Sequence, residues 1–549
     1  MVLLRPLVVL LSLSLSLVCA ADPASNYAGS TVAASYPPAG VTNTAINAYF
    51  PGASQVGYPG PTPTGAEPDA IETAPTYPKV TNAYPLSRPN TADDVGDHFD
   101  VMKNWGNLSP MFSIEDLGVP DASPMIPVGC GLNQVFLLIR HGARYPTSGS
   151  GPAQFAAQIH AAATSSGFNV SGPLEFLATW TYKLGAEILT PFGRKALFDS
   201  GVAFRMRYGH LLDAFSDLPV WRTTSEDRMV DSALNFAAGF FDVRTYESDY
   251  HQEIIIEASG FNNTLAPYET CNNANTDSIG YYGSTQANKW SQIYLQSALS
   301  RLQPMITGYN LTIDDLSNMQ MMCAYEVVAL GFSEFCALFT AEEWEGFEYA
   351  IDLEFWYNDG PGNPTAAAQG LGYVQELVSR LTQTRITTWN STTNSTLDSN
   401  DITFPLDQPI FVDATHDVVI SNILTALNFT SLAATGPLPV DYIPPERSYV
   451  ASKIAPFASN LVAQVLSCPA SGESTHIRFI LNDAVLPMTG INGCEDDSNG
   501  LCSLPSFVSA MHRRIAEIDF AFDCFANYTM PDPDHITDGR YPDWLKNAA

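Results

Sequence analysis

Two arginines and a histidine directly follow an apolar run in this sequence. Residues 136–139 are Phe-Leu-Leu-Ile, and Arg140, His141 and Arg144 come next, in a segment that also holds a glycine and a proline. Such a run predicts a buried strand that ends in a loop, and α/β folds bind ligands at the carboxyl ends of strands. Guanidinium groups match phosphate oxygens, and a histidine between two of them would face the phosphorus. The segment therefore predicts a phosphate site.

A second segment could add another arginine to this site. Thr224 or Ser225 can cap a helix that has Arg228 in its first turn. Helix N-termini attract anions through their free N–H groups, so a phosphate beside Arg228 is reasonable. Taken alone, an arginine at a helix start is more often an exposed side chain than a ligand.

A third segment supplies a histidine and a carboxylate. His416 and Asp417 close a second apolar run, at residues 410–414. A lone His-Asp pair at a strand end often only satisfies backbone groups. The three segments together favour one phosphate-handling site.

The charge of the chain restricts its partners. The 549 residues include 57 acidic and 25 basic ones, for a formal net charge of -32 and a pI near 4.4. This balance argues against binding nucleic acid or an anionic membrane surface. It also opposes an anionic substrate at neutral pH, and this repulsion fades towards the pI. We therefore expect an acidic working pH.

The N-terminal region predicts export. Residues 1–20 carry Arg5, an apolar Ser/Leu/Val run and a small-residue exit, which is typical of a signal peptide. A membrane anchor is the alternative, but the apolar run is short for one, and no later segment approaches a membrane-spanning length. Residues 21–95 are rich in Ala, Pro, Ser and Thr and predict a flexible stalk or propeptide. The remaining residues, 96–549, would form the catalytic unit.

Cysteines and glycosylation sequons agree with export to an extracellular or cell-wall location. Eight of the nine cysteines remain once the signal peptide, which contains Cys19, is removed. An even number suits an oxidising compartment, and eight cysteines allow about 105 pairings. Metal ligation is the alternative, but no clustered Cys/His spacing is present. Eight Asn-x-Ser/Thr sequons indicate a glycoprotein with N-glycans, at Asn107, Asn169, Asn262, Asn310, Asn390, Asn394, Asn428 and Asn527.

The pattern along the chain predicts an α/β fold. Thr190 and Pro191 open a helix, and the residues from roughly 265 to 400 are mostly helical in pattern. Strand character returns at residues 410–414 and 477–481. Strands on both sides of a helical block predict an α/β core with a smaller inserted, mainly α-helical subdomain.

Taken together, these segments resemble the signatures of the histidine acid phosphatases, the family that includes the fungal phytases. The resemblance extends from about residue 100 to about residue 525. It implies a histidine-phosphatase-type α/β core, with His141 as the nucleophile that accepts the phosphoryl group. Arg140, Arg144, Arg228 and His416 would hold the phosphate oxygens, and Asp417 would protonate the leaving group. No cofactor or metal is implied.

Two further expectations come with the resemblance. The arginines oppose protonation of His141 and so keep a nucleophilic imidazole in acid, where Asp417 can carry its proton. The family also implies four disulfides, namely Cys130–Cys468, Cys271–Cys524, Cys323–Cys336 and Cys494–Cys502.

The substrate class is less closely determined. Phytases with a strong phytate preference tend to have lysines just after the first motif and after a Glu-x-Trp segment. Here no Lys or Arg lies between Pro146 and Trp180, and the second place reads Trp-Glu-Gly-Phe-Glu at residues 344–348. We therefore expect a broad acid phosphomonoesterase that accepts small phosphate monoesters, phytate among them. A dedicated phytase, a phosphoglycerate-mutase-type transferase and a catalytically inactive secreted binding glycoprotein are the alternatives.

Overall fold

A computed structural model describes residues 79–80, 83–93, 95–469 and 475–546. The expected signal peptide and most of the expected stalk lie outside these residues. The described part of that stalk packs on the rest of the chain, since the N–H of Ser87 donates to Gly331 and that of Ala92 to Phe339, both at 2.8 Å. The packed chain therefore begins before residue 96.

One mixed sheet forms the centre of the fold. Its strand order is β10-β8-β7-β1-β6-β3-β4, and β9 pairs with β8. The strands β1, β6, β3 and β4 are parallel, whereas β7, β8 and β10 continue the sheet antiparallel beyond β1. The bounds of these strands are β1 Gly131–Arg140, β3 Val220–Thr224, β4 His251–Ile255, β6 Ile410–Thr415, β7 Asn460–Ser467, β8 Thr475–Leu481, β9 Ala484–Val485 and β10 Cys502–Ser503. A separate two-stranded sheet pairs β2 Asn169–Val170 with β5 Ile306–Thr307.

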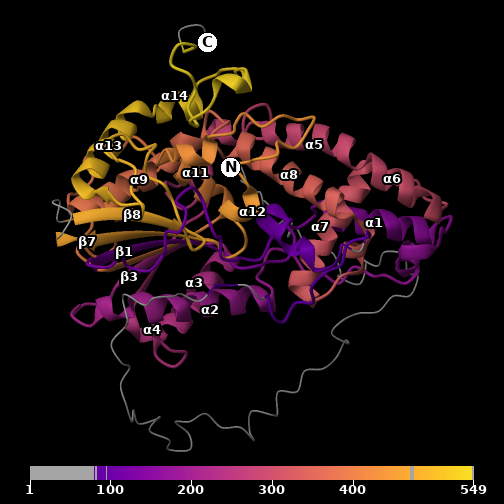
Figure 1. Ribbon diagram of the computed structural model, residues 1–549, viewed down its shortest axis with the longest axis horizontal. Coiled ribbons are helices and arrows are strands. Elements are labelled where there is room, and N and C mark those ends of the chain that lie inside the picture. Colours follow the sequence, from indigo (N-terminus) through magenta and orange to yellow (C-terminus); the bar gives the residue numbers. More distant parts are fainter. Residues whose placement is uncertain (1–78, 81–82, 94, 470–474, 547–549) are drawn as a thin grey trace, which may run out of the picture.

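Helices cover both faces of the central sheet, with α2 and α3 below it and α9, α11 and α13 above it in Figure 1. The remaining long helices, α5 to α8 and α1, lie beside the sheet. The bounds are α1 Gly151–Thr164, α2 Pro191–Tyr208, α3 Asp227–Phe241, α4 Tyr246–Asp249, α5 Tyr282–Tyr294, α6 Gln296–Leu302, α7 Ile313–Leu330, α8 Ala341–Asn358, α9 Ala366–Thr382, α10 Ser395–Asp398, α11 Asp417–Ala426, α12 Ala451–Ile454, α13 Leu504–Glu517 and α14 Phe520–Phe525.

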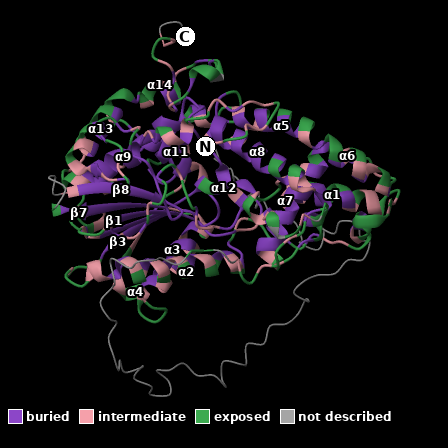
Figure 2. Cartoon of the chain, in the orientation of Figure 1, coloured by how far each residue is buried: buried purple, intermediate pink, exposed green. Residues whose placement is uncertain are grey.

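The alternation of side chains along β1 explains why helices pack on both faces of the sheet. Val135, Leu137 and Ile139 belong to the apolar cluster that includes the buried residues of α2 and α3, whereas Phe136 and Leu138 belong to the cluster of α9 and α11. A strand that is apolar on both faces is what a buried parallel arrangement requires. Figure 2 shows the central strands largely buried, with most of the exposed residues on the outer helices and loops.

The α2 helix begins where the sequence predicts. The Thr190 hydroxyl accepts from the N–H of Gly193 at 3.0 Å, and Pro191 occupies the first turn. Its buried face contacts α3, and a Cβ at Gly201 would lie 2.1 Å from the carbonyl oxygen of Phe236. Glycine is therefore needed at position 201 for the two helices to pack this closely.

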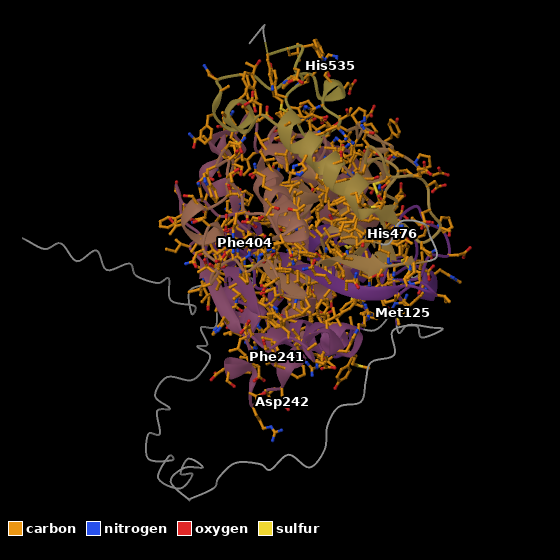
Figure 3. All side chains as sticks on the ribbon, turned by 90° about the vertical axis from the view of Figure 1, so that its left-hand side faces the viewer. Met125, Phe241, Asp242, Phe404, His476 and His535 are labelled. Carbon is orange, nitrogen blue, oxygen red and sulfur yellow. A yellow bond between two sulfur atoms is a disulfide. The ribbon has the colours of Figure 1, made fainter. Side chains whose placement is uncertain are left out.

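A buried ionic cluster joins the middle of the sheet to α9. Asp413 on β6 accepts from Arg222 on β3 and from Arg380 on α9, both at 2.7 Å, and Arg222 also pairs with Glu376 at 2.7 Å. Phe404, labelled in Figure 3, covers the guanidinium groups of Arg222 and Arg380 at 5.4 and 4.7 Å. The cluster fixes β6, the strand that directly precedes His416.

The cysteines pair as the family resemblance implies. The structure contains the disulfides Cys130–Cys468, Cys271–Cys524, Cys323–Cys336 and Cys494–Cys502. The first crosses 338 residues of sequence and ties the start of β1 to the end of β7. Among the described residues, no helix combines the length and the apolar character that crossing a membrane requires.

Candidate active site

The carboxyl ends of four neighbouring parallel strands converge on one site. Arg140 ends β1 and His141 follows it, while His416 and Asp417 follow β6. Arg228 lies four residues after β3, in the first turn of α3. The three segments singled out in the sequence are therefore brought together by the strand order β1-β6-β3.

His141 is buried, and its backbone and ring are both fixed. Its N–H donates to the Thr415 carbonyl at 3.1 Å, and its carbonyl accepts from the N–H of Ala458 at 3.0 Å. The ring Nδ1 lies 2.8 Å from the Gly142 carbonyl oxygen. Because a carbonyl can only accept, Nδ1 carries the proton and Nε2 keeps its lone pair. Burial, followed by the charges of Arg140 and Arg144, holds the pKa of His141 well below its usual value.

Arg140 and Asp417 form a buried ion pair beside His141. The Arg140 Nη2 atom lies 2.6 Å from Asp417 Oδ2, and Nη1 donates to the carbonyls of Asn107 and Ala455. The guanidinium group also stacks on Phe457 at 4.4 Å. Burial lowers the pKa of Arg140 to about 10, so this arginine remains charged at acidic pH.

Asn107, from the 3₁₀ helix η6 (Gly106–Leu108), contacts Asp417 directly. Its Nδ2 donates to Asp417 Oδ2 at 2.8 Å. Burial raises the pKa of Asp417, but Arg140 and then this hydrogen bond outweigh burial and hold the pKa below its usual value. Asn107 is also one of the predicted glycosylation sites, and a glycan would replace one of the two hydrogens on this nitrogen beside Asp417. The sequence showed Asn107 only as part of a sequon, and no motif indicated its contact with Asp417.

Arg144 and Arg228 contribute two more guanidinium groups. Arg144 Nη1 donates to the Tyr145 carbonyl at 2.9 Å. Arg228 pairs with Glu226 at 2.5 Å and with Glu187 at 3.3 Å. The start of its helix differs from the sequence prediction, because the N-cap is Glu226 and no side chain caps the helix.

Neither Thr224 nor Ser225 caps α3, as the sequence had predicted that one of them would. Thr224 is the last residue of β3, and the Ser225 hydroxyl accepts from the N–H of Glu257 at 2.9 Å. The side chain of Ser225 therefore ties the end of β3 to the segment after β4. The arginine is in the first turn as predicted, although the capping assignment was wrong.

His416 meets a carboxylate that the sequence did not indicate. Its Nε2 lies 3.1 Å from Glu257 Oε2, with both side chains at most 5% exposed, and 3.8 Å from Glu226. The Tyr268 hydroxyl donates to the other oxygen of Glu257. Glu257 follows β4, so the fourth parallel strand also supplies a residue to the site.

Three buried N–H groups at the site have no acceptor. The Nε atoms of Arg140, Arg144 and Arg228 make no hydrogen bond to any described residue. Buried donors are almost always satisfied, so three guanidinium nitrogens at one place without a partner among the described residues indicate a site for an anion. A phosphate group offers the oxygen acceptors that would satisfy them.

One group of donor atoms is also compact enough for a cation. Glu226, Glu257 and His416 place donor atoms within 4.8 Å of one another. However, Glu226 already pairs with Arg228 and Glu257 with His416, so we assign these residues to an ion-pair network.

The second segment considered for substrate preference has mostly structural contacts. Within residues 344–348, only Glu345 is exposed. Glu348 is buried and accepts from the N–H groups of Gly106 and Ser452, so its charge does not face a substrate. Its carboxylate joins η6 to α12, and the carbonyls that accept from Arg140 belong to Asn107 in η6 and to Ala455 directly after α12.

Comparison with known proteins gives the same picture. Phytase A of Aspergillus oryzae is 32% identical over 439 residues, covering 77% of this chain and 91% of that protein. Phytase A of Aspergillus fumigatus is 34% identical over 425 residues, covering 74% and 87%. The crystal structure of the phytase from D. castellii superposes with a TM-score of 0.62 at 24% identity, covering 83% of this chain and 93% of that one, which shows the shared fold.

The family assignment follows from the matched residues. Residues 131–482 match the sequence profile of the histidine phosphatase superfamily (branch 2). This span contains β1, β3, β4 and β6 and every site residue named above except Asn107. The chain belongs to branch 2 of the histidine phosphatase superfamily and is a phosphoric monoester hydrolase.

Proposed function

We propose that the chain is an extracellular acid phosphomonoesterase that works through a phosphohistidine intermediate and accepts phytate among other monoesters. The observation that carries this proposal is the set of three buried arginine Nε–H groups without acceptors beside an unprotonated His141 Nε2. The relatives named Phytase A support phytate as one substrate. The four disulfides and the apolar N-terminal segment support the extracellular location.

In the first step, the lone pair on His141 Nε2 attacks phosphorus, and the bond from phosphorus to the ester oxygen breaks. The guanidinium groups of Arg140, Arg144 and Arg228 stabilise the charge on the phosphoryl oxygens. The departing oxygen takes the proton of Asp417 as the alcohol leaves. In the second step, Asp417 accepts a proton from water as that water attacks the phosphorus, and the phosphorus–nitrogen bond breaks.

The charge on Asp417 makes this cycle depend on acid. In the empty site Arg140 and Asn107 hold the pKa of Asp417 below its usual value, against the effect of burial. The negative charge of a bound phosphate offsets Arg140 and raises that pKa. Proton donation is therefore supported by substrate binding and by an acidic medium together.

The test is phosphate release from phytate and p-nitrophenyl phosphate, from about pH 2.5 to about pH 7, without added metal. We expect activity on both, with the higher kcat/KM on p-nitrophenyl phosphate. His141→Ala should abolish both activities while the protein stays folded. Turnover retained in that variant would contradict the phosphohistidine mechanism, and a strong phytate preference would instead indicate a dedicated phytase.

A further inference from the structure

Glu257 makes the closest carboxylate contact to His416. The two side chains are 4% and 5% exposed, and 3.1 Å separates Glu257 Oε2 from His416 Nε2. Glu257 is itself fixed on two sides, because its Oε1 accepts from the Tyr268 hydroxyl and its backbone N–H donates to the Ser225 hydroxyl. The Tyr268 ring also meets the His416 ring edge-on at 6.0 Å.

The surroundings of His416 otherwise oppose a positive charge on it. The imidazole is only 5% exposed, which disfavours its charged form, and His416 is the N-cap of α11, where the free N–H groups of the first turn are partly positive. A carboxylate in contact is the element that offsets this environment. The charged and titratable groups that interact with His416 are His141, Asp417, Glu226, Glu257 and Tyr268, while Arg140, Arg144 and Arg228 act on the neighbouring His141.

We infer that Glu257 is a positioning residue that holds His416 as a doubly protonated imidazolium, with one N–H on Glu257 and the other available to a phosphate oxygen. A carboxylate can only accept, so the contact places a proton on Nε2. The second ring nitrogen donates to phosphate only when it is also protonated, and the buried negative charge of Glu257 favours that form. This inference rests on the proposed function.

The ionisation of Glu257 suits it to this positioning role. Burial raises its pKa, but the hydrogen bond and charge of His416 outweigh burial and lower the pKa to about 2. Glu257 therefore stays ionised throughout the acidic range in which the enzyme is expected to work. Glu226 is a weaker partner, since it is 36% exposed, lies 3.8 Å from His416 and pairs with Arg228.

The test measures binding of inorganic phosphate to Glu257→Gln by calorimetry, which needs no turnover. At about pH 6 we expect binding to weaken about ten- to a hundredfold, the range for a lost hydrogen bond between charged groups. At about pH 3.5 the medium itself favours the protonated form of an imidazole, so the difference from the wild type should largely disappear. The KM of p-nitrophenyl phosphate should rise in the same pH-dependent way.

Glu226→Gln is the matched comparison, because it removes one carboxylate charge from the same neighbourhood without the short contact. It should change phosphate binding at about pH 6 less than Glu257→Gln does. Equal effects of the two substitutions would overturn the inference, as would a Glu257→Gln variant with wild-type phosphate binding.

A further variant covers the case in which Glu257→Gln does not fold. Glu257→Asp keeps the charge but withdraws it from His416. It should weaken phosphate binding more at about pH 6 than at about pH 3.5. A pH-independent loss would overturn the inference. The proposed function is tested separately, by the turnover of the wild type and of His141→Ala. The role of Glu257 and the proposed function can therefore fail independently of each other.

Discussion

At the scale of single residues, the site pairs an acid with the groups that hold its charge. Asp417 shares one oxygen between Arg140 at 2.6 Å and Asn107 at 2.8 Å. Both contacts favour the carboxylate over the carboxylic acid, so the proton donor is held in its charged form until substrate arrives. Asn107 thus bears on the pH at which the acid can act.

Asn107→Ala tests this role. Losing a hydrogen bond to the charged form raises the pKa of Asp417, so the acid keeps its proton to higher pH. The basic limb of the kcat profile on an alkyl phosphate should move up by about half to one pH unit. Steady-state kinetics across the acidic range will measure the shift. A limb that stays in place or moves down would count against the role.

Asp417→Asn is the control for that experiment, because it removes the proton altogether. It should slow alkyl phosphates far more than p-nitrophenyl phosphate, whose leaving group needs little protonation. Equal losses on both substrates would contradict the assignment of Asp417 as the general acid. They would also contradict the proposed effect of Asn107 on its pKa.

At the scale of elements, the site depends on four parallel strands ending at the same edge. Two of these ends could be predicted, because Arg140-His141 and His416-Asp417 follow apolar runs. The end of β4 could not, because Glu257 belongs to no recognisable motif and reaches His416 only through the pairing of β4 with β3. Helix capping at Thr224 or Ser225 failed for a related reason, since β3 extends through Thr224 and Ser225 bonds to Glu257.

Asn107 and Glu348 show the same limit of prediction from the sequence. The first reads as a sequon and the second as a charge in a substrate pocket, yet both are determined by partners far away in the sequence. Local pattern predicts which elements form, whereas the contacts between elements decide what an individual polar side chain does.

The buried cluster around Asp413 carries a prediction at this scale. Asp413→Asn leaves Arg222 and Arg380 buried without their shared carboxylate, between β3, β6 and α9. We expect a loss of about 3–5 kcal/mol in the free energy of unfolding, the usual result of breaking a buried ion pair. Denaturant unfolding will measure it.

The exposed Lys195–Asp199 pair on α2 is the control for the Asp413 experiment. Its side chains are 42% and 56% exposed, so Asp199→Asn should cost about 0–1 kcal/mol. If the two substitutions cost the same, the cluster does not hold the sheet to α9.

At the scale of the whole molecule, several buried carboxyls favour an acidic medium. Burial is the first cause that raises the pKa of Asp398 to about 8, that of Asp523 to about 8 and that of Glu253 to about 7. A group whose pKa is raised in the folded state contributes stability below its ordinary pKa and loses it as pH rises through the raised value. These three groups therefore destabilise the fold between about pH 4 and about pH 8.

Other carboxyl groups determine how low the pH can fall before the fold loses stability. Burial raises the pKa of Asp413, but Arg222 and Arg380 outweigh it and lower the pKa to about 2, and Glu257 is likewise lowered to about 2. Their contribution is present above the ordinary carboxyl pKa and is lost as pH falls through the lowered value. The two sets together predict a stability maximum near pH 4 to about 5.

Thermal unfolding at a series of pH values tests this expectation. The Tm should be highest at about pH 4 to 5 and fall steadily towards about pH 8, where the net negative charge of the chain also grows. Asp523→Asn should come nearest to the wild type at about pH 4 and exceed it by most at about pH 8, because it cannot acquire the buried charge. The same substitution at the exposed Asp199 should leave the slope unchanged. A wild-type Tm that rises between pH 5 and pH 8 would mean that these buried carboxyls do not set the stability of the fold, and that acidity matters only at the active site.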